Sequence, residues 1–133
     1  MSQLIKDGRK SLEKYGIIFR ADEKCLLFPF NLSEEEMKEL ENEIKNFYKV
    51  ERNYVGLKVI TERGSVHFSR RLYGFEKRFA IESFVYGCAI EDFKEVANTA
   101  IQKTIVGEKL FGYWAKEVGK EEAEKRLKEI TKI

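Results

Sequence analysis

Residues 54–87, YVGLKVITERGSVHFSRRLYGFEKRFAIESFVYG, decide the fold class of this chain. Apolar and polar side chains alternate in three successive segments, at residues 55–60, 65–70 and 79–86. Because successive side chains of a β-strand point to opposite faces, each alternating segment predicts a strand. The Arg63-Gly64 pair suits a tight turn between the first two segments, so the whole stretch predicts a three-stranded antiparallel meander.

Two short apolar runs before the meander predict a hairpin of paired strands. They comprise residues 16–20 and 24–28, and Pro29, the only proline, ends the second run because it has no backbone N–H to donate. Together with the meander, the hairpin makes a predicted sheet of five antiparallel strands.

Helical periodicity occurs before, between and after these strands. Ser2 is a capping residue for a first predicted helix. The capping box Ser33-Glu34-Glu35-Glu36 is the strongest local signal, and it predicts a helix from Ser33 to about Lys49. Further helices are predicted from Glu91 to Val106 and from Lys120 onward. The buried stripe of the second helix is predicted to contain Met37, Leu40, Ile44, Phe47 and Tyr48.

The order of these elements predicts an α+β fold in which a five-stranded antiparallel sheet is flanked by helices. A chain of 133 residues with 43% apolar residues can form one core. We expect an α+β domain at residues 1–106 and a helical extension packed on it at residues 107–133. Leu110, Phe111, Tyr113 and Trp114 in the extension either pack it onto the domain, as is usual for large aromatics, or dock a peptide or second subunit if exposed.

The sequence favours a cytoplasmic protein without membrane insertion. Its first residues lack the basic and apolar regions of a secretion signal, and no run of about 18 apolar residues occurs. Cys25 and Cys88 lack the spacing of a zinc site, so we expect buried, reduced thiols rather than ligands or a reactive group.

Basic and acidic residues cluster in different stretches of the chain, although the net charge is only +2. Seven cations and two acids occur between Arg52 and Arg78, whereas six glutamates and two lysines occur between Ser33 and Lys45. We expect such sorting if one face of the molecule meets a partner.

The cations and aromatics of the meander are the main candidates for a binding surface. Arginine binds carboxylates or phosphates through paired hydrogen bonds, and aromatics stack on bases or fill protein pockets. Strand alternation gives the alternative that the aromatics form the core while the cations are solvated. The residues predicted here to contact a partner are Arg63, His67, Arg70, Arg71, Lys77 and Arg78.

No motif for catalysis, for a cofactor or for a metal stands out in the sequence. The HExxH, GxSxG, GxGxxG and P-loop patterns are absent. His67, the only histidine, has no carboxylate or second ligand beside it. Glu34 and Glu41 belong to a solvated helix face where nothing would raise a carboxyl pKa. We therefore expect a protein that binds rather than catalyses, with no cofactor or metal.

The order of elements also resembles the profilin-like fold of profilins, roadblock modules and longin domains. Residues 30–40, FNLSEEEMKEL, resemble the segment that opens the second helix of profilins. Residues 56–60, 65–67 and 79–81 are similar to their central strands. The resemblance covers about residues 1–105.

The resemblance to profilins implies binding of monomeric actin and regulation of filament assembly. The implied contacts come from the outer meander strands and the helix that follows, around Arg70, Arg71, Lys77, Arg78, Asn98 and Lys103. Two features depart from the family. The first predicted helix has only Tyr15 in place of the aromatics that bind polyproline, and the chain continues beyond the family's last helix.

Two further interpretations stay open. Roadblock and longin modules imply dimerisation through the sheet or a helix, with small GTPases as partners. Alternatively, the basic meander suits RNA or single-stranded DNA, whose phosphates attract clustered cations. The sequence overall favours a small protein-interaction module whose partner is actin or a small GTPase.

Overall fold

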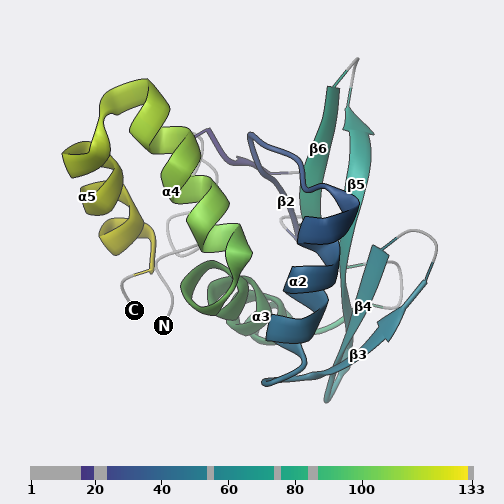
Figure 1. The fold of residues 1–133 in the computed structure, drawn as a ribbon. Helices are drawn as coiled ribbons and strands as arrows, with labels where there is room; N and C mark the ends of the chain where they lie inside the picture. Colours follow the sequence, from purple (N-terminus) through teal and green to yellow (C-terminus); the bar gives the residue numbers. More distant parts are fainter. Residues whose placement is uncertain (1–15, 20–23, 54–55, 74–75, 84–86, 132–133) are drawn as a thin grey trace.

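The computed structural model describes residues 16–19, 24–53, 56–73, 76–83 and 87–131 (Figure 1). Within these ranges the chain is an antiparallel sheet covered by helices, which confirms the predicted α+β class with helices at the C-terminal end. The first predicted helix, with Ser2 and Tyr15, lies outside the described residues.

The described sheet has the strand order β1-β2-β6-β5-β4-β3, and every neighbouring pair is antiparallel. A strand is present in each of the five predicted segments, and β3 adds one strand at an edge of the described sheet. The last meander strand, predicted over residues 79–86, ends at Glu82, and residues 84–86 lie outside the described residues. The register pairs Phe68 of β5 with both Leu57 of β4 and Ile81 of β6, so these three apolar side chains share one face. The strands are β1 (Ile18–Phe19), β2 (Cys25–Leu27), β3 (Lys49–Arg52), β4 (Gly56–Thr61), β5 (Gly64–Tyr73) and β6 (Glu76–Glu82).

The capping box predicted at Ser33 is present at the start of α2 (Glu34–Ile44). The Ser33 hydroxyl accepts from the Glu36 amide at 3.1 Å, and the Glu36 carboxylate accepts from the Ser33 amide at 2.8 Å. The helix ends at Ile44, earlier than the predicted end near Lys49. The chain turns there because the next residues form β3, which pairs with the free edge of β4.

The predicted helix from Glu91 to Val106 is divided into two helices, α3 (Ile90–Lys103) and α4 (Ile105–Val118). Thr104 separates them with an extended backbone. Gly107 lies inside α4 rather than at a break, and a Cβ at this position would lie 1.9 Å from the Ile101 carbonyl oxygen. Glycine is therefore required by the close approach of the two helices. The last helix is α5 (Lys120–Thr131).

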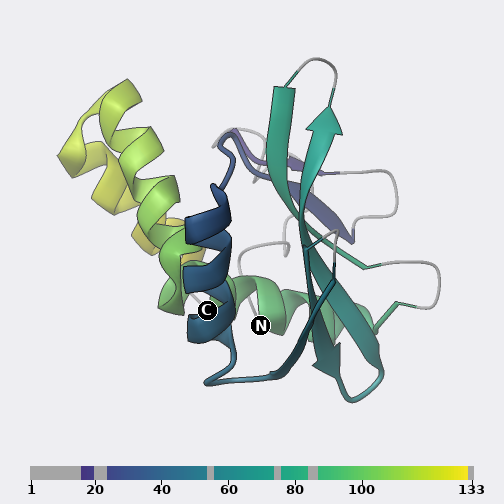
Figure 2. The same cartoon turned by 45° about the vertical axis from the view of Figure 1, so that its right-hand side comes forward.

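The described helices lie on one side of the sheet, with α5 stacked on the outer side of α4 (Figures 1 and 2). The core between sheet and helices includes residues of the extension, and the Trp114 side chain is fully buried. Leu110 is buried and Phe111 and Tyr113 are partly buried against the same core. Burial of this cluster, rather than exposure, therefore attaches the helices after Gly107 to the rest of the fold.

Cys25 and Cys88 are buried, free cysteines, as expected from their isolated positions. Burial, followed by the charge of Asp92, raises the pKa of the Cys88 thiol above its usual value. None of the described helices has the length and apolar character needed to cross a membrane.

Candidate functional site

The cations expected to form one partner surface are distributed over different parts of the sheet. Arg70 has the same strand parity as Phe68, on the face that the helices cover. Its guanidinium donates to the Leu32 carbonyl at 3.3 Å and pairs with Glu34 at the start of α2. Lys77 is exposed, Arg78 is half-buried, and Arg71 is paired in register with Arg78. Arg70 thus contributes to the attachment of α2.

The two positions taken from the helix after the sheet also differ in accessibility. Asn98 in α3 is only 8% exposed, so its side chain offers almost no surface for the contact that the resemblance implies. Lys103, at the end of the same helix, is exposed. Helical periodicity alone does not show this difference, because other parts of the fold bury one face and leave the other open.

The oppositely charged stretches of the sequence pair with each other within the fold. Arg52 of β3 lies 3.1 Å from both Glu34 and Glu41 of α2, and Lys109 of α4 lies 3.1 Å from Glu36. Partly exposed pairs of this kind contribute at most about 1 kcal/mol each. Arg70, one of the meander cations that the nucleic-acid interpretation requires, also pairs with Glu34 of α2. Attraction between the acidic and the basic stretches therefore helps to hold α2 against the sheet.

His67 lies in β5 between Lys58 of β4 and Glu82 of β6 in the register. Its Nε2 atom is 3.1 Å from the Ser65 hydroxyl oxygen. Burial, with a smaller contribution from Lys58, lowers the pKa of the imidazole below 6.5. Glu82 is buried and accepts from the Ser69 hydroxyl at 3.5 Å. Burial therefore favours the neutral form of the imidazole.

A second part of the surface, of which the sequence indicated only Arg63, contains a hollow of about 530 Å³. We call it the acidic hollow. Three parts of the chain surround it: the segment that leaves α2, the β4–β5 turn, and the first turns of α3. Its lining residues are Phe47, Tyr48, Lys49, Ile60, Thr61, Glu62, Arg63, Glu91, Asp92, Glu95 and Val96.

Hydrogen bonds between distant segments fix the walls of the acidic hollow. The Tyr48 hydroxyl donates to the Glu95 carboxylate at 3.1 Å, and burial, more than Glu95, raises its pKa to about 12. Arg63 donates to the Asp92 carboxylate at 3.1 Å and so connects the β4–β5 turn to α3. A Cβ at Gly64 would lie 2.1 Å from the Gly87 carbonyl oxygen, so the turn packs closely on the segment before α3.

Phe47 occupies the edge of this hollow with half of its surface exposed (50%). It was predicted to belong to the buried stripe of α2, and that prediction is wrong. The helix ends at Ile44, and the backbone amide of Phe47 bonds to the Ile44 carbonyl in the following turn, so the helical period does not extend to residue 47. Tyr48, one residue later, is partly buried against the core as expected.

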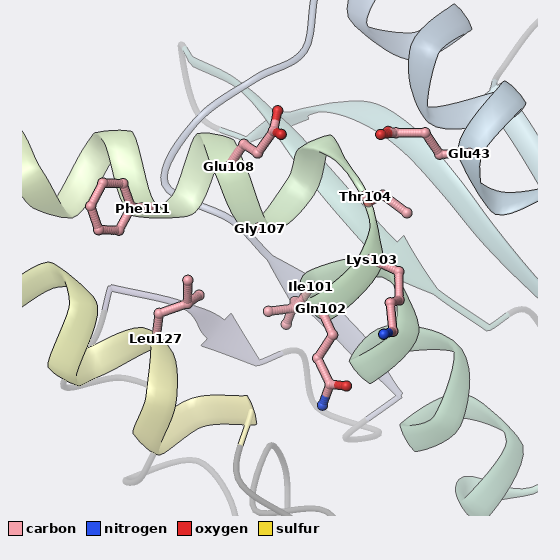
Figure 3. A pocket seen from close by; sticks show the side chains of 9 residues that line it. All are labelled: Glu43, Ile101, Gln102, Lys103, Thr104, Gly107, Glu108, Phe111 and Leu127. Atoms are coloured by element: carbon pink, nitrogen blue, oxygen red, sulfur yellow. The ribbon is translucent and has the colours of Figure 1, made fainter.

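Another hollow, of about 550 Å³, lies where α2, α3, α4 and α5 meet (Figure 3). We call it the helical hollow. Ile101, Phe111 and Leu127 form its apolar part, while Lys103 and Glu108 are polar residues at its edge. The Glu43 carboxylate on its wall already accepts a hydrogen bond from the Ile105 amide at 2.9 Å. This carboxylate therefore has a structural role.

No protein-family model, curated protein or solved structure matches this chain. The resemblance to profilins therefore stays a prediction. Among the described residues, no group of three or more acidic, histidine or cysteine side chains is arranged to hold a metal ion.

Proposed function

We propose that this chain is a small, non-enzymatic protein-interaction module that binds its partner at the acidic hollow. The observation that carries the proposal is the position of Phe47, a residue that is half exposed and lines a hollow whose walls are fixed by hydrogen bonds. Exposed aromatic side chains next to preformed hollows are frequent anchors of protein–protein contacts, because their burial on binding contributes much of the affinity.

Capture of partners from a lysate of the source organism tests this proposal. The wild-type chain is compared with Phe47→Ala, which removes the aromatic ring from the edge of the hollow. Val118→Ala is the matched control, because Val118 is also a large exposed apolar residue, at 40%, but lies at the end of α4. Partners that Phe47→Ala loses and Val118→Ala retains support the proposal. Retention of every partner by Phe47→Ala contradicts it.

Monomeric actin is the first specific partner to test. The resemblance to profilins implies contacts from the outer meander strands and the following helix, and the acidic hollow lies where the β4–β5 turn meets α3. If the chain binds monomeric actin, it should slow or alter filament assembly when it is added at a concentration on the order of tens of micromolar. A polymerisation assay that shows no effect at such concentrations rejects actin as the partner.

A dimerising regulator is the second candidate, because β3 is an edge strand of the described sheet and has a self-complementary sequence. Small GTPases as its partners rest on the resemblance to roadblock and longin modules alone. If two copies paired antiparallel about Val50, Lys49 of one would face Glu51 of the other on both sides. Opposite charges on paired strands are favourable, and a two-fold axis brings the same surface together twice. A monomeric mass in light scattering over a range of concentrations would argue against this candidate.

A further inference from the structure

We infer that the acidic hollow recognises a basic segment of its protein partner, with a Lys or Arg side chain placed beside Phe47. This inference rests on the proposed function and specifies the chemistry of the partner. It follows from three properties of the hollow: its negative charge, the aromatic residue at its edge, and a carboxylate of which one oxygen has no hydrogen-bond partner among the described residues.

The charge of the hollow is opposite to the small positive charge of the whole chain. Its lining contains four carboxylates and two cations, and one of those cations, Arg63, is already paired with Asp92. Glu62 and Glu91, the sequence neighbours of Arg63 and Asp92, are exposed in the same lining. Clustered carboxylates attract a cationic side chain and repel phosphate groups, so the surface favours a basic peptide over a nucleic acid.

The aromatic edge favours a cation within a peptide chain over a free ion. A guanidinium or ammonium group is attracted to the face of an aromatic ring such as Phe47. The apolar stem of a Lys or Arg side chain also covers apolar surface while its charged end reaches a carboxylate. A volume of about 530 Å³ is within the range of pockets that hold one small ligand or a long side chain.

Asp92 supplies the third observation. Its side chain is only 15% exposed, and Arg63 occupies just one of its oxygens, Oδ1. The other oxygen, Oδ2, has no hydrogen-bond partner among the described residues. A buried carboxylate oxygen without a donor is unfavourable, so a small adjustment that admits a donor from a bound cation would be favourable at this position.

Fluorescence anisotropy with labelled peptides tests the inference. The peptides share one Gly/Ser sequence with a single apolar residue and differ only at a central position, which is Arg, Lys, Gln or Glu. We expect the Arg and Lys peptides to bind at least about tenfold more tightly than the Gln and Glu peptides, with affinity that falls as salt is added.

Charge variants of the chain locate the binding. Glu62→Lys combined with Glu91→Lys should weaken binding of the Arg peptide about tenfold, and the milder Glu62→Gln with Glu91→Gln should weaken it less. Glu39→Lys is the matched control, because Glu39 is an exposed acid of α2 outside the hollow. Circular dichroism confirms that each variant is folded.

Several results would overturn the inference. One is that the Arg and Gln peptides bind equally well, or that no peptide binds. Another is that both double variants bind the Arg peptide as tightly as the wild type does. A third is that free spermidine displaces the Arg peptide and binds with the same affinity as that peptide. The capture experiment separates this failure from failure of the proposed function. If Phe47→Ala loses a partner that the charge variants retain, the hollow is a docking site but its partner segment is not basic.

Discussion

The Glu43 carboxylate of α2 accepts a hydrogen bond from the Ile105 amide of α4 at 2.9 Å, across 62 residues of sequence. The first amides of a helix have no acceptor within the helix, and here a side chain from another helix supplies one. The Thr104 hydroxyl accepts from the next amide, that of Val106, at 3.2 Å. The start of α4 is thus capped both locally and from α2, which positions the helices after Thr104 on the domain.

Replacement of Glu43 should therefore destabilise the protein. Glu43→Ala leaves the Ile105 amide without its acceptor, and we expect the free energy of unfolding to fall by about 1 kcal/mol. Glu43→Gln keeps an oxygen acceptor and should have a smaller effect. Urea denaturation measures both variants, with Glu39→Ala as the control on an exposed position of the same helix. Equal stabilities of Glu43→Ala and Glu39→Ala would show that the cap contributes nothing.

Two glycines of α4 should respond to alanine in opposite directions. A Cβ at Gly107 would lie 1.9 Å from the Ile101 carbonyl oxygen, so Gly107→Ala forces α3 and α4 apart and should cost about 2 kcal/mol or more. Gly112 has no atom within 4 Å of the same position, and Gly112→Ala should stabilise the helix by about 0.5–1 kcal/mol. Thermal denaturation compares the two. A similar gain in both variants would mean that helix propensity, not contact, determines the result.

Arg70 should prove to be a structural residue rather than a partner contact. Its guanidinium bonds to the Leu32 carbonyl and pairs with Glu34, so Arg70→Gln should lower the free energy of unfolding by about 1 kcal/mol. Lys77→Gln, an exposed position in the next strand, should change it by less than about 0.5 kcal/mol. Urea denaturation and capture of partners are measured on the same samples. Loss of a partner without loss of stability in Arg70→Gln would restore its predicted binding role.

Tyr48 should ionise at higher pH than a free tyrosine. Burial raises its pKa to about 12, from 10.0 in the unfolded chain. Because the unfolded state releases this proton first, the contribution of Tyr48 to stability is present below pH 10 and is lost between pH 10 and about 12. Ultraviolet absorbance titration of the wild type and Tyr48→Phe isolates the contribution of this residue. A difference spectrum that titrates near pH 10 would contradict the buried environment.

His67 should produce the opposite change at low pH. Its folded-state pKa lies below 6.5 because burial disfavours the charged imidazole. The unfolded state therefore binds the proton first, and this contribution to stability is present above pH 6.5 and lost as the pH falls through the folded-state pKa. His67 is the only histidine, so proton NMR follows its titration without ambiguity. A midpoint at or above 6.5 would contradict the prediction, and His67→Gln should reduce the fall in stability between pH 7 and 5.

Much of the fold could be predicted because the relevant signals are local. The alternation in β4, β5 and β6 reflects the two-residue period of a strand, and the capping box at Ser33 involves atoms three residues apart. Such patterns need no knowledge of the rest of the molecule. The class of fold and the start of α2 were accordingly predicted correctly.

Apart from Arg63, the candidate site could not be predicted, because the acidic hollow brings together three segments that are distant in sequence. The end of α2 at Ile44 depends on pairing of β3 with β4, and this ending leaves Phe47 exposed. The contribution of Asp92 to the site depends on its ion pair with Arg63, which belongs to the β4–β5 turn. Helical periodicity predicts a face for each residue but not which other segment covers that face.

The sequence by itself determined the α+β class, the central strands and the separation of acidic from basic stretches. Only the tertiary structure decided what those charges do. Arg52 and Arg70 pair with the glutamates of α2, whereas the acids of the β4–β5 turn and α3 gather beside Phe47. The physical reason is that periodicity and capping act over a few residues, while ion pairs and hollows depend on distances that the packed chain alone establishes.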